Sequence, residues 1–359
     1  VKPGGDPSPP GDGDAYAVIH YQRSDDDYGD HTTGDFNKFW GLHLWGDGID
    51  PAEVTEWSTP KPFLGEDAYG RFAWVTLQSA SQDVNFIVHR GESKDGTDAD
   101  RKFNPATDGP EIWLKQGDAT YYPSQAAAQG FVTIHYQRPD GVYTGWGLHL
   151  WGDALAEGVG TTWEAPRPFD GEDDFGVYWQ VPIEDASQVV NFIIHKGDEK
   201  DPGPDQSMDP ISGADVWIKA GDETIYTDRG AAEKTVTLHY HRADGDYGDL
   251  NSTNFADFWG LHVWTGAANP NPDWEHPLKP TGEDQFGLIF AVPLAADATE
   301  LAYILHRGDT KDPGPDQFLN VAKSGYTVWQ LAMADPAAPY VLPIRKVAAG
   351  GGDLNKAQA

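Results

Sequence analysis

The sequence predicts an all-β protein made of three tandem antiparallel β-sandwich domains. The same four sequence blocks recur three times, in constant order, along the 359 residues. Each repeat consists of short β-branched and aromatic runs bounded by Gly, Pro, Asn and Asp, without long helical periodicity. Several short strands within about 100 residues are typical of two packed antiparallel sheets.

Four blocks define each repeat. In the second repeat they read TIHYQR from Thr133, GWGLHLWGD from Gly145, NFIIHKGDEKD from Asn191 and DVWIKAGD from Asp215. The first repeat has VIHYQR, FWGLHLWGD, NFIVHRGESKD and EIWLKQGD, and the third has TLHYHR, FWGLHVWTG, AYILHRGDTKD and TVWQL. This repetition predicts three homologous domains, called modules 1, 2 and 3 below, with boundaries at 14–123, 130–228 and 234–344. Because the first residue is not Met and no signal peptide is visible, we expect a fragment of a longer protein.

The composition excludes several classes of function. With 57 acidic against 25 basic side chains, the formal net charge is −32, which repels nucleic acid and anionic membrane surfaces. No run of about 18 apolar residues is available to span a bilayer. The lack of cysteine excludes a disulfide framework and a cysteine nucleophile. We therefore expect a monomer without a cofactor, a nucleic-acid partner or membrane insertion.

Strand alternation separates the tryptophans into two groups. In the second block of module 2, Trp146 and Leu148 share one side, and His149 and Trp151 share the other. Because the apolar side faces the core, Trp146 is predicted to be buried while His149 and Trp151 point outward. The same alternation in modules 1 and 3 predicts inward Trp40 and Trp259 and outward His43, Trp45, His262 and Trp264.

The repeated outward Trp beside an outward His indicates a binding platform. A flat indole can stack on the apolar C–H face of a sugar ring while nearby polar groups hold the hydroxyls. A neutral polyhydroxy ligand also suits an acidic chain, since it has no charge to be repelled. The alternative is that a loop or a neighbouring domain covers Trp151.

A lysine and an aspartate follow the third block. Lys200 and Asp205 flank a Pro-Gly-Pro turn, and Lys311 and Asp316 flank the same turn in module 3. The restricted turn holds a donor and an acceptor for vicinal hydroxyls before the ligand arrives. Module 1 has one more residue after Lys94, so its aspartate is assigned to Asp100. The alternative is a solvated turn with an incidental ion pair.

Together these blocks resemble the pullulanase-associated carbohydrate-binding module, family 41. The resemblance extends over all three repeats. It implies an immunoglobulin-like β-sandwich that binds α-glucans such as starch, pullulan, glycogen and maltooligosaccharides. It also implies a secreted or surface-bound bacterial protein, in which this non-catalytic region tethers a pullulanase or α-amylase to its substrate.

The resemblance also implies which residues contact glucose units. They are His43, Trp45, Lys94, Asp100, His149, Trp151, Lys200, Asp205, His262, Trp264, Lys311 and Asp316. Members of the family often have a second platform aromatic. Strand parity makes Trp217 the candidate for it in module 2.

Three other interpretations remain open. Paired carboxylates could hydrolyse glycosides, but GEDAYG, GEDDFG and GEDQFG are typical of hairpin turns. The runs Asp12–Asp14 and Asp25–Asp27 could bind calcium in a cell-surface adhesin, although no EF-hand spacing is present. A zinc site formed by His135, His149 and His195 is a weaker alternative.

Overall fold

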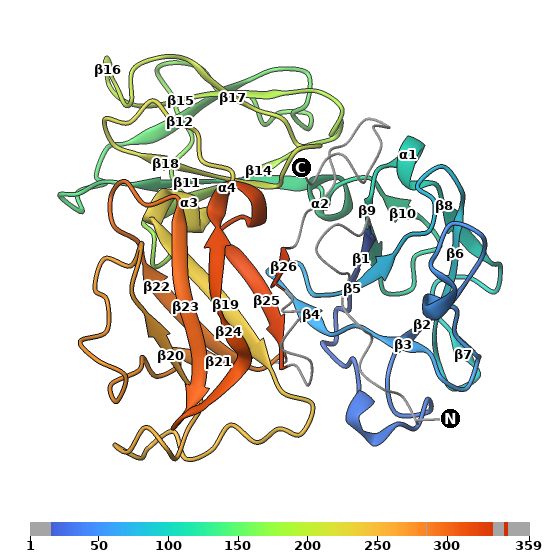
Figure 1. Cartoon of the computed structure of the whole chain (residues 1–359). Coiled ribbons are helices and arrows are strands. Elements are labelled where there is room, and N and C mark those ends of the chain that lie inside the picture. The colour runs from blue at the N-terminus through green and yellow to red at the C-terminus, as the bar shows by residue number, and fades with distance from the viewer. Residues whose placement is uncertain (1–15, 285, 333–340, 344–359) are drawn as a thin grey trace. The chain divides into compact units, whose positions relative to one another are not determined.

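The computed structural model describes residues 16–284, 286–332 and 341–343 (Figure 1). The chain divides into two compact units, Val1–Tyr121 with Lys234–Ala359, and Tyr122–Glu233. Modules 1 and 3 therefore belong to one unit, and module 2 forms the other. Each module contains two β-sheets, so the all-β sandwich prediction is confirmed.

Module 2 shows the arrangement of the two sheets. The first sheet has the strand order β13-β14-β11-β18, and the second has β12-β15-β16 with β17 also paired to β15. The strands are β11 (Phe131–Gln137), β12 (Gly147–Trp151), β13 (Gly171–Glu172), β14 (Val177–Pro182), β15 (Val190–Lys196), β16 (Glu199–Lys200), β17 (Gln206–Met208) and β18 (Asp215–Lys219).

Module 1 repeats this plan with two more short strands. Its first sheet has the order β10-β9-β1-β5-β4, and its second has β3-β2-β6-β7 with β8 also paired to β6. The strands are β1 (Tyr16–Gln22), β2 (Gly41–Trp45), β3 (Lys61–Pro62), β4 (Gly65–Glu66), β5 (Arg71–Thr76), β6 (Val84–Arg90), β7 (Ser93–Lys94), β8 (Arg101–Phe103), β9 (Glu111–Lys115) and β10 (Tyr121–Tyr122).

Module 3 merges the last strands of its second sheet into one. Its sheets have the orders β21-β22-β19-β25-β26 and β20-β23-β24. The strands are β19 (Thr235–His241), β20 (Gly260–Val263), β21 (Gly282–Glu283), β22 (Leu288–Pro293), β23 (Glu300–Arg307), β24 (Thr310–Asn320), β25 (Thr327–Leu331) and β26 (Val341–Pro343).

Each module has one parallel strand pair, a feature that the predicted antiparallel sandwich lacks. β11 is antiparallel to β14 but parallel to β18, and β1 and β19 are likewise parallel to β9 and β25. The last strand returns to the first sheet only after the chain has passed through the second sheet. It is therefore not joined to the first strand by a hairpin and is free to run parallel to it.

The helices are short and lie between the strands. They are η1 (His31–Thr33), η2 (Pro51–Glu53), α1 (Pro105–Asp108), α2 (Gln125–Gln129), α3 (Arg229–Glu233) and α4 (Val321–Ser324). The Ser124 side chain accepts from the Ala127 N–H at the start of α2, and Gly130 ends that helix in the left-handed region. Within the described part of the chain, no helix is long and apolar enough to span a bilayer.

The cores follow the predicted alternation. Val132, Ile134 and Tyr136 of β11 are fully buried, and Trp146 is 5% exposed. Trp259 is also buried, and the half-buried Trp40 packs against the core of module 1. In each module an arginine guanidinium lies over the inward indole at 4.4–4.5 Å from the ring centroid: Arg23 over Trp40, Arg138 over Trp146 and Arg242 over Trp259.

A separate apolar cluster explains why modules 1 and 3 form one unit. The Trp329 ring of module 3 lies 5.2 Å from Phe72 and 6.0 Å from Trp74 of module 1. By strand register, Tyr178 and Gln180 of module 2 are the counterparts of Phe72 and Trp74. The outer face of this sheet is thus apolar in module 1 and more polar in module 2.

Candidate functional site

The outward His of each module lies on a strand of the second sheet, and the outward Trp lies at the end of that strand or directly after it. In module 2, β12 pairs with β15 so that His149 lies opposite Ile193, and Trp151 lies opposite Asn191. The His149 and Trp151 rings are 5.2 Å apart and inclined by 28°. Both side chains are partly exposed, and therefore they form an accessible aromatic surface.

A further tryptophan, which the sequence reasoning missed, completes this surface. Trp163 lies in the loop after β12 and stacks on His195 with a centroid distance of 3.9 Å and an angle of 12°. Its ring also meets the edge of His149 at 5.7 Å. His149 therefore lies between Trp151 and Trp163, and the two indoles are inclined to one another because they make angles of 28° and 76° with the same imidazole.

Backbone and side-chain bonds hold the Trp163 loop against β12. Thr161 Oγ1 accepts from the Leu150 N–H at 2.8 Å and lies 3.0 Å from His149 Nδ1. Arg167 and Leu148 exchange two backbone hydrogen bonds on the far side of Trp163. Trp163 is thereby held at both ends of its loop, and its ring has little freedom to lose on binding.

Modules 1 and 3 have the same ring arrangement. Trp57 stacks on His89 at 3.8 Å, and Trp274 stacks on His306 at 3.8 Å. The adjacent pairs are His43 with Trp45 at 5.1 Å and His262 with Trp264 at 5.9 Å. We call the loop Trp, the two His and the strand Trp of each module its aromatic platform.

The histidine beneath the loop Trp is buried and oriented by the backbone. His89, His195 and His306 are at most 1% exposed, and their Nδ1 atoms lie 2.8–2.9 Å from the carbonyl oxygens of Gly91, Gly197 and Gly308. A carbonyl only accepts, so Nδ1 carries the hydrogen. These glycines have φ of 57–59°, a conformation that side chains other than Gly rarely adopt.

Burial favours the neutral form of five platform histidines. It lowers the pKa of His43, His149 and His262, and it also lowers the pKa of His89 and His306. Thr161 Oγ1 accepts from the Leu150 N–H, so its own hydrogen can point to Nδ1 of His149. The hydrogen of that neutral ring is then on Nε2.

The predicted lysines lie beside the loop Trp. Lys200 Nζ is 5.5 Å from the Trp163 ring centroid and 3.1 Å from Asp205 Oδ1. The corresponding distances to Trp57 and Trp274 are 5.9 Å for Lys94 and 5.2 Å for Lys311. The structure thus brings the lysine, the aspartate and the platform of module 2 together.

The acidic partner differs in modules 1 and 3. Lys94 Nζ donates to the Asp98 backbone carbonyl at 2.8 Å, so its described contact is not with Asp100. Asp100 is exposed and lies near enough to His43 to oppose the lowering of its pKa. Asp316 is exposed on β24, and in this module the Pro-Gly-Pro segment is part of that strand rather than the predicted turn.

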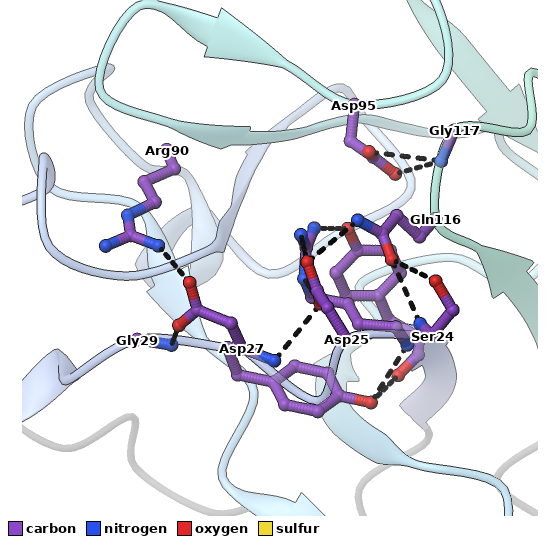
Figure 2. A network of polar contacts seen from close by, with 11 residues as sticks. Ser24, Asp25, Asp27, Gly29, Arg90, Asp95, Gln116 and Gly117 are labelled. Carbon is purple, nitrogen blue, oxygen red and sulfur yellow. Dashed lines mark hydrogen bonds and ion pairs between the residues drawn. The ribbon is translucent and has the colours of Figure 1, made fainter.

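The residue after each lysine anchors it to the fold. In module 1, Asp95 is 7% exposed and accepts from the Gly117 N–H at 3.1 and 3.2 Å (Figure 2). In module 2, Asp201 accepts from Gly221 N at 2.7 Å and from Arg138 Nη1 at 3.0 Å. These contacts restrict the backbone from which the neighbouring lysine extends.

Trp217 is not the second platform aromatic. Its outward orientation was read correctly, but β18 belongs to the first sheet of module 2, where Trp217 stacks on His135 at 5.1 Å. His135 therefore lies on a different sheet from His149 and His195, and the zinc triad is not formed. Trp163 had a sequence signal: it follows Trp151 by twelve residues, as Trp57 follows Trp45.

The aspartates considered for calcium have other partners. Asp25 accepts from Arg23 Nε and from the Asp27 N–H, each at 3.1 Å, and Asp27 pairs with Arg90 at 3.0 Å (Figure 2). Asp12 and Asp14 lie outside the described residues. Among the residues that the structure describes, no group of three or more His, Asp or Glu is arranged to hold a metal ion.

The GED blocks form turns, as predicted. Asp173 accepts from the N–H groups of Phe175 and Gly176 between β13 and β14, and Asp67 does the same for Tyr69 and Gly70. Each of these carboxylates also contacts the histidine of the first sheet, His135 or His20. Their role is therefore to hold the turn and that histidine.

Each module is thus a β-sandwich that presents a partly exposed aromatic platform on its second sheet. Residues 15–123, 130–227 and 234–335 match the family described as the bacterial pullanase-associated domain. The chain belongs to this family and contains three copies of its domain.

The chain matches only a small part of two much longer relatives. An α-amylase of Streptomyces lividans is 43% identical over 136 residues, which are 37% of this chain and 14% of the amylase. Pullulanase A of Streptococcus pneumoniae serotype 2 is 26% identical over 203 residues, which are 52% of this chain and 15% of the pullulanase. A solved structure that describes α-glucan binding by a streptococcal virulence factor is 21% identical, with 60% of this chain and 97% of that one covered and a TM-score of 0.31.

Proposed function

We propose that the three modules bind α-glucans and hold a glycoside hydrolase on its polysaccharide substrate. The observation that carries the proposal is the aromatic platform, repeated three times with a lysine beside the loop Trp. Two indoles can each stack on the C–H face of a glucose unit, while the ammonium and imidazole N–H groups donate to its hydroxyls.

The inclination of the indoles favours α-linked over β-linked glucose chains. An α-1,4 chain curves, so consecutive rings face in different directions, whereas a β-1,4 chain is a flat ribbon. Trp151 and Trp163 make angles of 28° and 76° with His149, and Trp45 and Trp57 make angles of 30° and 72° with His43. Inclined indoles match a curved chain better than a flat one.

The names of the relatives agree with this proposal. They include an α-amylase and pullulanase A, and the chain matches only a small part of each. A binding region within a larger enzyme accounts for that partial match. Because an enzyme that digests an external polymer must meet it outside the cell, we place the protein in the secreted or cell-surface compartment.

Three linked sites also strengthen attachment to a polymer. One exposed stacking site has modest affinity, but tethering the modules raises the effective concentration for the next contact. Avidity can exceed the affinity of one site by roughly 10²–10⁴. The assigned contacts are His43, Trp45, Lys94, Asp100, His149, Trp151, Lys200, Asp205, His262, Trp264, Lys311 and Asp316, to which we add Trp57, Trp163 and Trp274.

Titration with maltooligosaccharides while tryptophan fluorescence is recorded tests the proposal. We expect a saturable change with maltoheptaose and none with cellooligosaccharides of similar length. An equal response to both series would contradict the α-glucan assignment. A surface adhesin of another specificity would give no response to either, and release of reducing sugar by this chain would contradict a purely binding role.

A pair of variants separates binding from folding. Trp151→Ala should remove binding by module 2 and leave it folded, because the side chain is partly exposed. Trp146→Ala should instead lower the free energy of unfolding by about 3–5 kcal/mol, as a truncation in the core. Binding is measured in a chain that also carries Trp57→Ala and Trp274→Ala, so that module 2 is the only intact platform. Unfolding of module 2 by Trp151→Ala would show that this tryptophan is structural.

A further inference from the structure

Among the described residues of module 3, one large aromatic side chain is exposed. Phe318 is 59% exposed, the highest value among the large hydrophobic residues that are exposed in the described structure. It lies on β24 opposite Ala302, while the next residue, Leu319, is 2% exposed and packs in the core. The exposed Phe318 side chain contributes little to the stability of the fold, because the opposite face of the strand packs in the core.

Phe318 continues the cross-strand row that contains the platform Trp. The Trp264 N–H donates to the Ala302 carbonyl at 3.2 Å, and Ala302 pairs with Phe318 on the neighbouring strand. The Trp264 and Phe318 rings are 6.4 Å apart at 85°. An aromatic surface thus runs from Trp274 through Trp264 to Phe318.

The other modules have polar side chains along the same row. In module 1, Asn85 lies opposite Trp45 on the neighbouring strand, and Lys102 lies opposite Asn85 on the next. Lys102 Nζ pairs with Asp83 at 2.6 Å. In module 2, Trp151 is followed by Asn191 and Ser207.

The two changes in module 3 have a common effect. Ala302 stands where the other modules have an asparagine, and Phe318 stands where they have a lysine or a serine. Together they extend the aromatic surface in module 3 alone.

We propose that Phe318 forms an additional glucose-binding subsite next to Trp264, so that module 3 contacts a longer stretch of glucan than modules 1 and 2. This inference rests on the proposed function. A chain that leaves the Trp264 face crosses the small Ala302 side chain and reaches the Phe318 ring. There the C–H face of one more glucose unit removes apolar surface from water.

The test uses the full chain with Trp57→Ala and Trp163→Ala, so that only module 3 has a complete platform. Isothermal titration calorimetry with maltotriose through maltoheptaose then gives affinity as a function of length. Phe318→Ser, which introduces the residue of module 2, should lower the affinity for maltoheptaose about 5- to 10-fold and leave the affinity for maltotriose unchanged. Thermal unfolding should be unaltered, since the side chain is exposed.

The reciprocal variant is the matched control. In a chain whose only complete platform is that of module 2, Asn191→Ala with Ser207→Phe should raise the affinity for maltoheptaose and not for maltotriose. If Phe318→Ser leaves every affinity unchanged, or lowers all of them equally, the additional subsite is wrong while α-glucan binding stands. If the parent chain with module 3 intact binds no maltooligosaccharide, the proposed function fails and the subsite fails with it.

Discussion

Each module contains two stacked Trp–His pairs, one on each sheet. The two pairs differ in the groups that surround the imidazole ring. In module 1, Trp57 lies on His89 on the platform, and Trp113 lies on His20 on the first sheet, with ring distances of 3.8 and 4.8 Å. His89 meets a backbone carbonyl, whereas His20 lies 3.0 Å from Asp67 and 3.6 Å from Glu111.

The different partners move the two pKa values in opposite directions. Burial lowers the pKa of His89. Burial would also lower the pKa of His20, but Asp67 and Glu111 overcome it and raise the value to about 9. The Trp–His pair on the second sheet therefore has a neutral imidazole and belongs to the accessible platform. The pair on the first sheet has a charged imidazole and is buried; we call it the support.

Truncation of the two tryptophans should give the largest contrast. Trp113 is 5% exposed, so Trp113→Ala should lower the free energy of unfolding by about 3–5 kcal/mol. Trp57 is partly exposed, and Trp57→Ala should cost about 1–2 kcal/mol but remove glucan binding by module 1. Chemical denaturation and titration of a chain with Trp163→Ala and Trp274→Ala measure both effects. Equal losses of stability would remove the distinction between platform and support.

Loss of the acidic partner of His20 should have the next largest effect. Asp67→Asn keeps the Oδ1 that accepts from Tyr69 and Gly70 but removes the carboxylate paired with His20. We expect the free energy of unfolding to fall by about 2 kcal/mol, measured by chemical denaturation. The pKa of His20 should also fall, and NMR titration measures it. Asp173→Asn in module 2 is the control, and its effect should be smaller because that pair is more exposed.

The two histidine classes should also respond oppositely to pH. The lowered pKa values of His43 and His89 mean that their neutral form is favoured in the folded state, so the stability of module 1 should fall as pH drops below about 6.5. The raised pKa of His20 adds stability below about pH 6.5, and this contribution is lost as pH rises through about 9.

Denaturation at several pH values between 5 and 9 tests this opposition. In His20→Gln the loss of stability on the alkaline side should disappear, while the loss of stability below about pH 6.5 should persist. A stability that does not fall between pH 6.5 and 5 would contradict the lowered pKa values of His43 and His89.

The smallest effect is expected at the lysine beside the platform. Lys200→Gln should weaken binding by module 2 about 5-fold, because one exposed charged donor is lost. Asp205→Asn should act in the same direction, since it removes the partner 3.1 Å from Lys200. Both side chains are exposed, so unfolding should not change by more than about 0.5 kcal/mol. If neither variant affects affinity, the turn is a solvated ion pair without a role in binding.

Local sequence pattern was enough to predict part of the site. The alternation through residues 146–151 correctly predicted that Trp146, just before β12, is buried and that His149 and Trp151 point outward. It could not predict Trp163, since a loop residue has no period, and only the bonds from Thr161 and Arg167 bring the loop back over β12. The alternation also predicted correctly that Trp217 points outward. It could not show that Trp217 lies on the first sheet, away from the platform, because alternation does not tell which strands pair.

The sequence by itself determined the three repeats, the all-β class and the face of each strand that is buried, because these depend on residue order and on an alternation of two. Only the tertiary structure decided which loop covers which strand, that modules 1 and 3 form one unit, and that Phe318 extends the row from Trp264. Each of these depends on contacts between residues far apart in the chain, which no local pattern records.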